Sequence, residues 1–110
     1  MAFSEYARQK ALTALLRDVM TVALLSGGQE LSDQNYRRQL TGFGVDAEGD
    51  WRNLDGLQFP PLSVDTVVDG WRLLDATGAE IASEPTKPKV YEAGDQPFLN
   101  PGDLVVGLEA

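Results

Sequence analysis

The chain contains no cysteine and no histidine among its 110 residues. The absence of cysteine excludes disulfides, thiolate catalysis and sulfur-ligated zinc or iron. The absence of histidine removes the side chain that most often acts as the base behind a serine or threonine nucleophile. Most hydrolase mechanisms therefore lack a necessary part, and we predict a protein that is not an enzyme and that needs no cofactor.

Basic residues and long apolar runs are also scarce. The chain has 9 Lys and Arg residues against 17 Asp and Glu residues, a net charge of −8. A surface of this sign repels a phosphate backbone, so we expect no nucleic-acid partner. The apolar run 19–25 is far shorter than the ~20 residues that span a bilayer, and no signal-peptide pattern is visible. We therefore expect that the protein does not associate with a membrane and that it is made in the cytoplasm.

The pattern of the chain predicts a single domain, residues 1–110. Residues 4–19 are typical of a helix that covers one side or end of a sheet, with Ser4 as the N-cap. Its apolar stripe consists of Leu12, Leu15, Leu16 and Val19. From residue 20 onward, short apolar runs alternate with turn residues. We therefore predict a mainly β fold, an antiparallel β-sandwich or small barrel over about 20–108, with one N-terminal α-helix over about 4–19.

The expected strands follow from these short runs. The clearest hairpin joins 67–75 to 79–83 through a turn in which Gly78 supplies a positive φ. Prolines at 60 and 61 end one strand, because proline cannot donate a ladder hydrogen bond. The remaining strand predictions are 20–25, 36–43, 56–59, a segment near 88–91, and 104–108.

Two groups of carboxylates are candidates for chemistry. Asp46, Glu48 and Asp50 alternate in one loop and could offer calcium several oxygen ligands, although their spacing is not that of an EF-hand. The alternative for this loop is a solvated turn. Asp65 and Asp69 could be imagined as a glycosidase pair, but four extended residues separate them by roughly 13 Å. We therefore interpret Asp65 and Asp69 as ordinary turn or outward-facing carboxylates.

Two tryptophans and two arginines are the candidates for structural or interface roles. Trp71 lies in an alternating strand and is expected in the core. Trp51 and Arg52 lie in a polar segment, where an exposed Trp51 would serve as an interface anchor or a sugar-stacking platform. Arg38 is expected to be held by a carboxylate such as Glu30, because an unpaired buried charge is costly. A partner-binding Arg38 is the alternative.

An ordered set of short motifs runs through most of the chain. It resembles a group of small structural proteins from tailed bacteriophages, labelled tail-fibre or minor tail proteins. Two departures are Asp33, where that family often has glycine, and 26–28, which replaces a His-Thr loop. The matching positions are Glu30-Leu31-Ser32, Tyr36, Arg38-Gln39, Asn53, Phe59-Pro60, Leu74-Asp75-Ala76, Gly94-Asp95, and Gly102 with Leu104.

The resemblance implies a virion component, made in the host cytoplasm, that acts by assembly and has no catalytic residues. Its partners would be other copies of itself and other virion proteins at the tail, the neck or the capsid surface, including head-decoration positions. Analogy with that class of protein narrowly favours a trimer. The alternative function is a receptor- or carbohydrate-binding β-sandwich module, for which calcium-dependent glycan binding would be the distinguishing property. On the residues alone, Trp51, Arg52 and Arg38 are the candidate partner-interface residues.

Overall fold

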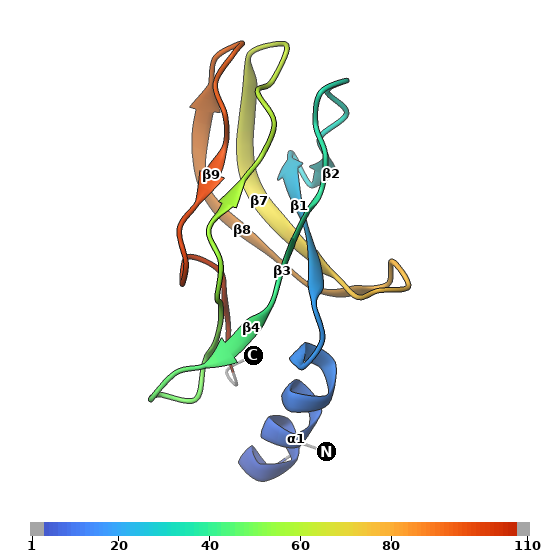
Figure 1. Ribbon diagram of the computed structural model, residues 1–110, viewed down its shortest axis with the longest axis vertical. Helices are drawn as coiled ribbons and strands as arrows, with labels where there is room; N and C mark the ends of the chain where they lie inside the picture. Colours follow the sequence, from blue (N-terminus) through green and yellow to red (C-terminus); the bar gives the residue numbers. More distant parts are fainter. Residues whose placement is uncertain (1–3, 108–110) are drawn as a thin grey trace.

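The structure is a computed structural model that describes residues 4–107. Its shape is elongated, 45 × 26 × 26 Å, with the N-terminal helix at one end (Figure 1). The elements in chain order are α1 (Glu5–Leu16), β1 (Met20–Ser26), β2 (Gln29–Glu30), β3 (Gln39–Thr41), β4 (Phe43–Val45), β5 (Trp51–Asn53), β6 (Leu57–Gln58), β7 (Thr66–Leu74), β8 (Glu80–Tyr91), β9 (Phe98–Leu99) and β10 (Val105–Val106).

Antiparallel pairing organises the strands into a large sheet and two small ones. The large sheet has the order β2-β1-β7-β8, and β3 pairs with β1 beyond the end of β2. The small sheets have the orders β10-β5-β4 and β6-β9. Only Gly42 separates β3 from β4, so residues 39–45 pass from the large sheet to the first small one. The large sheet ends at β8 and is not closed, so the fold is the predicted mainly β, sandwich-like one, and not a barrel.

The hydrophobic core lies between the large sheet and the two small sheets. Register places Val22 of β1 opposite Leu73 of β7, and Leu24 opposite Trp71. Trp71 is 5 % exposed, which confirms its predicted place in the core. Burying a side chain of this size stabilises the fold by ~1.5–3 kcal/mol. The small sheets and their loops contribute Phe43, Trp51, Leu57, Phe59, Leu62 and Leu104 to the same core.

The helix begins where the sequence predicts. Ser4 is extended, and its Oγ accepts a hydrogen bond from the Ala7 N–H at 3.1 Å, as an N-cap does. The helix ends at Leu16, earlier than the predicted residue 19, because Met20 is already paired with Thr41 in the large sheet. The prediction was therefore three residues too long at this end.

The apolar stripe predicted for residues 12–19 is only half covered. Leu16 is buried and Leu12 packs against the core, whereas Leu15 and Val19 are 45 % and 57 % exposed. One further tie is the hydrogen bond from Gln9 Nε2 to the Gly49 carbonyl, at 3.1 Å. The helix therefore covers one end of the sandwich rather than a face of its sheet (Figure 1).

The hairpin of β7 and β8 confirms the predicted turn. Gly78 has a φ of 88°, and Asp75 Oδ1 accepts hydrogen bonds from the N–H groups of Thr77 and Ala79. One prediction here is wrong in its extent: 79–83 and 88–91 are parts of one strand, β8, which continues through Pro85 and Pro88. This is possible because β8 is an edge strand, where one side of the backbone needs no ladder partner.

Two other strand predictions need correction. The expected strand 36–43 is replaced by the shorter β3 and β4, and residues 36–38 are not in a strand. Side-chain contacts hold residues 36–38 instead. The expected strand 104–108 is found as Val105–Val106, and Leu108 lies outside the described residues.

Candidate functional site

Trp51 is buried, so the prediction that it is an exposed interface anchor is wrong. Its exposed fraction is 8 %. β5 is the central strand of its small sheet, with Trp51 opposite Val45 of β4 and Val106 of β10. Alternation along β5 turns Trp51 and Asn53 into the core and Arg52 outward. Trp51 therefore offers no platform for a sugar or a partner.

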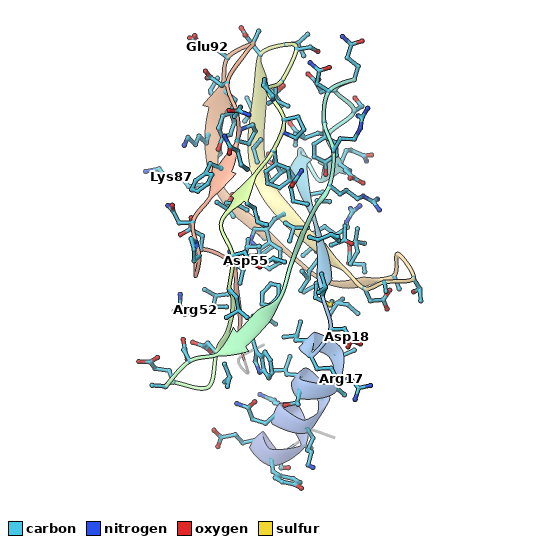
Figure 2. The ribbon with its side chains drawn as sticks, in the orientation of Figure 1. Arg17, Asp18, Arg52, Asp55, Lys87 and Glu92 are labelled. Atoms are coloured by element: carbon cyan, nitrogen blue, oxygen red, sulfur yellow. The ribbon has the colours of Figure 1, made fainter. Side chains whose placement is uncertain are left out.

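Arg52 ties two turns together from the outer face of β5. Its Nε donates to Asp46 Oδ2 at 2.7 Å, and its Nη1 donates to the Gly102 carbonyl at 2.9 Å. The guanidinium holds the pKa of the Asp46 carboxyl below its usual value. Nearly half of the Arg52 side chain remains exposed, and Figure 2 shows it near β4 and Asp55.

The acidic loop of residues 46–50 is organised around Asp46. Asp46 Oδ1 accepts hydrogen bonds from the N–H groups of Glu48 and Asp50, at 2.9 and 3.0 Å. The Arg52 guanidinium binds the other oxygen, Asp46 Oδ2, so a metal ion would have to compete with this cation for the carboxylate. Across residues 4–107, no group of three or more acidic side chains is arranged to hold a metal ion. The geometry favours the interpretation as a turn.

Arg38 forms a cluster with Glu30 and Tyr36. Its Nε and Nη2 donate to the two carboxylate oxygens of Glu30 at 2.8 and 2.7 Å, which confirms the predicted carboxylate clasp. The Tyr36 hydroxyl donates to Glu30 Oε2 at 2.8 Å and accepts from the Leu24 N–H at 3.1 Å. The pKa of Glu30 is lowered mainly by Arg38, whereas burial and the neighbouring Glu30 raise the pKa of Tyr36. The cluster fastens residues 36–38 to β1 and β2.

Sequence reasoning gave Arg72 no role, although it lies at the centre of the outer face of the large sheet. Arg72 stands opposite Ala23 of β1 and Ser83 of β8. Its Nε lies 2.8 Å from Glu80 Oε1. The alternation of Trp71, Arg72 and Leu73 along β7 was the signal that placed Arg72 outward. Its carboxylate partner is eight residues away across a hairpin.

Asp33 and Asn53 carry further structural contacts that the sequence did not specify. Asp33, at a position where the resembled phage proteins often have glycine, accepts hydrogen bonds from the Ser63 N–H and Oγ and from the Val64 N–H. Asn53 is 2 % exposed and bonds to the segment 100–104. Both residues therefore connect loops that are distant in sequence.

Asp65 and Asp69, the candidate glycosidase pair, each bind a different backbone N–H group. Asp65 Oδ1 accepts from the Ala93 N–H at 2.9 Å, and the Asp69 carboxylate accepts from the Gly27 N–H at 3.0 and 3.1 Å. These contacts support the interpretation as turn carboxylates. They do not bring the two side chains to a common site.

One open depression of about 620 Å³ lies at the end of the molecule remote from α1. Its ten lining residues, all within the described range, include four hydroxyl side chains and no aromatic ring. A sugar site normally offers an aromatic face for stacking. The lining residues are Ser26, Gln29, Glu30, Leu31, Ser32, Asp33, Gln34, Ser63, Val64 and Thr66.

The predicted site residues therefore do not converge on one site. Trp51 and Arg52 are neighbours on β5 but face opposite sides, and Arg38 belongs to the cluster near β2. The carboxylates of the clusters have lowered pKa values and are held ionised, which suits salt bridges and turns rather than proton transfer.

The described helix is too short and too polar to cross a membrane.

Comparison with known proteins adds no identification. No family model matches the chain, and no curated protein matches its sequence. The likeness to phage structural proteins therefore stays a prediction drawn from the order of its motifs.

Proposed function

We propose that the protein is a non-enzymatic structural component of a tailed-phage virion. It acts through self-association and through docking on the tail, the neck or the capsid surface. The observation that carries the proposal is the order of the motifs in the chain, from Glu30-Leu31-Ser32 to Gly102 and Leu104.

The contacts of several motif residues support this proposal, because these contacts maintain the fold, although Glu30, Leu31 and Ser32 also line the open depression. Tyr36 and Arg38 both bond to Glu30, and Asn53 bonds to the chain near Gly102. Gly102 has a φ of 87°, a conformation that favours glycine. Motif residues that maintain the fold are expected in a protein that acts by assembly.

The exposed apolar side chains also support assembly. Among the described residues, several large aliphatic side chains on strands and loops are more than half exposed. Proteins that act by assembly need such surface to bury against copies of themselves or against a shell or tube. The members of this set are Val19, Leu40, Val45, Leu54, Val64 and Val90.

The experiment that tests the proposal is quantitative mass spectrometry of purified particles of the phage that encodes the chain. We expect the protein to remain with the particles through a density gradient, in a fixed ratio to the major capsid protein. A phage replication protein in the same lysate serves as the control and is lost during purification. Loss of this chain together with the control contradicts the proposal.

Antibody labelling of the same particles assigns the position. Labelling at one end of the tail, at the neck or over the capsid distinguishes the three docking surfaces. The copy number per particle, compared with the symmetry of the labelled structure, tests the expected trimer.

A further inference from the structure

The half of β8 that follows Ser83 is exposed on both of its faces. Every residue from 84 to 90 is exposed, although Pro85, Lys89 and Val90 remain paired with β7. A strand in a sandwich normally turns alternate side chains into the core between the layers. The small sheets therefore leave the core-facing side of this half of β8 uncovered.

A second open depression, of about 250 Å³, lies between this half of β8 and the segment 97–99. Leu24 and Val68 line it, although both belong to the hydrophobic core and are only 3 % and 8 % exposed. The depression thus opens onto the side of the core. We call it the β8 groove, and its two walls are formed by Lys87, Lys89 and Tyr91 and by Pro97, Phe98 and Leu99.

Two lysines lie on the β8 wall of the groove. Register places Lys89 opposite Val68, and residues that stand opposite each other in a ladder point to the same face. Lys89 therefore points to the core-facing side of the sheet. Figure 2 shows Lys87 at the edge of the molecule, on the side where β8 and β9 lie. A lysine in such a position covers apolar surface with its stem and keeps its ammonium group in water.

The chain provides neither ammonium group with a carboxylate. Within residues 4–107, four arginines form ion pairs with carboxylates, but Lys87 and Lys89 form none. Lys89 Nζ lies instead over the Tyr91 ring, 5.1 Å from its centroid. Asp103, which also lines the groove, accepts a hydrogen bond from the Asn100 N–H. In a chain with 17 acidic residues against 9 basic ones, two cations therefore remain available to a carboxylate of another molecule.

The opposite wall of the groove is apolar. Pro97 is fully buried and Leu99 packs against the core, whereas Phe98 is 47 % exposed. A molecule in the groove thus meets two cations on one side and apolar side chains on the other. Carboxylates next to an aliphatic side chain match both walls.

We propose that the β8 groove binds a short, extended acidic segment of another virion protein. Alternate side chains of an extended segment point to the same side and repeat every ~6.6 Å. Lys87 and Lys89 are two residues apart on β8 and repeat at about the same spacing. Carboxylates at alternate positions of the segment meet the two ammonium groups, and the aliphatic side chain between them points to Phe98 and Leu99.

The size of the groove and the charge of the chain restrict the occupant further. Pockets that bind small molecules measure ~300–1,000 Å³, whereas a protein segment needs to insert only a single side chain here. The net charge of −8 disfavours a long acidic chain, so we expect carboxylates only beside Lys87 and Lys89. At physiological salt, charges more than ~8 Å away are largely screened, so the distant acidic residues oppose binding only weakly.

The test is a titration of the isotope-labelled full chain, followed by two-dimensional NMR at physiological salt. The probe is a capped hexapeptide in which glutamate and leucine alternate. It should shift the amide resonances of Lys87, Lys89 and Phe98 with a dissociation constant on the order of 1 mM, because exposed ion pairs contribute little each. A hexapeptide of alternating glutamate and serine should bind at least ~5-fold more weakly, because it buries no aliphatic side chain.

Three variants test the role of the lysines. Lys89→Gln removes one cation and should weaken binding of the glutamate and leucine peptide ~3-fold. Lys89→Arg keeps the charge and should bind as the wild type does. Lys10→Gln is the matched control, because it makes the same change of charge on α1, away from the groove (Figure 1), and it should leave the constant unchanged. All three positions are exposed, so the thermal midpoint should not change.

Four results would overturn the proposed groove. The first is that these amides do not shift with up to ~5 mM peptide. The second is equal binding of the serine and leucine peptides. The third is equal weakening by Lys89→Gln and Lys10→Gln, or no weakening by either, and in the latter case the lysines only protect the edge strand from pairing. The fourth is a shift of the same amides with protein concentration alone, which would make a second copy the occupant.

The inference rests on the proposed function for its choice of another virion protein as the partner, but the two fail separately. A chain found in particles whose groove amides do not respond to the peptide overturns the groove alone. A chain absent from particles overturns the proposed function, whatever the groove binds in solution.

Discussion

Asn53→Ala is expected to be among the most destabilising polar substitutions in the protein. Asn53 Nδ2 donates to the carbonyls of Asp55 and Asn100, at 2.8 and 3.1 Å. Its Oδ1 accepts from the buried Leu104 N–H at 2.8 Å. Alanine removes all of these bonds. The Leu104 N–H and the Asp55 carbonyl lose the Asn53 side chain as their partner, whereas the Asn100 carbonyl keeps the hydrogen bond from the Asp103 N–H. At ~1 kcal/mol for each bond, the expected loss in the free energy of unfolding is about 3 kcal/mol.

The assay is urea unfolding followed by tryptophan fluorescence. For an m-value of ~1.5 kcal/mol/M, a loss of 3 kcal/mol lowers the unfolding midpoint by ~2 M. Asn53→Asp should be at least as damaging, because it directs a carboxylate oxygen at two carbonyl oxygens and buries a charge. Asn35→Ala is the control, because Asn35 is exposed and its described contact to Asp33 comes from its backbone N–H.

The reasoning is refuted if Asn53→Ala costs less than ~1 kcal/mol while Asn35→Ala costs the same. That result would mean that water replaces the bonds of Asn53 without loss. A large loss for Asn53→Ala alone would establish the residue as the connection between β5 and the segment 100–104.

The remaining predictions concern the tryptophans, the carboxylates and calcium. Because both indoles are buried, Trp51→Ala and Trp71→Ala should each cost ~3–5 kcal/mol in urea unfolding, and a loss below ~1 kcal/mol for Trp51→Ala would contradict its burial. Arg38 lowers the folded-state pKa of Glu30 below its ordinary value of 4.5. The stability from this pair is therefore present above about pH 4.5 and lost as the pH falls through the lower folded-state pKa. The thermal midpoint of the wild type should consequently fall more than that of Glu30→Gln between about pH 5 and pH 3. EDTA should leave the thermal midpoint unchanged, and a fall of several degrees would restore the calcium interpretation of the loop 46–50.

Features governed by local rules were predictable from the sequence. The N-cap at Ser4 and the turn before Gly78 depend on residues within a few positions of each other, so their chemistry is visible in the chain. The core position of Trp71 followed from the alternation of its strand. The mainly β class followed in the same way from short apolar runs between turn residues.

Features that depend on how the strands pair and where they end were not predictable. Trp51 is buried because β4 and β10 pair with β5 on both sides, and β10 lies more than fifty residues further along the chain. Residues 36–38 leave the expected strand because Tyr36 and Arg38 bond to Glu30. β8 runs through two prolines because nothing pairs with its outer edge among the described strands. In each case the pairing of the strands or a specific side-chain contact overrides the local preference.

The direct passage from α1 into β1 has a mechanical consequence. Only residues 17–19 separate the helix from the strand that pairs with both β7 and β3. A pulling force applied to α1 would therefore be transmitted along the axis of β1. The ladder hydrogen bonds lie across that axis, so they would be loaded together in shear instead of opening one at a time. The helix is thus joined to the part of the fold that is best arranged to resist tension.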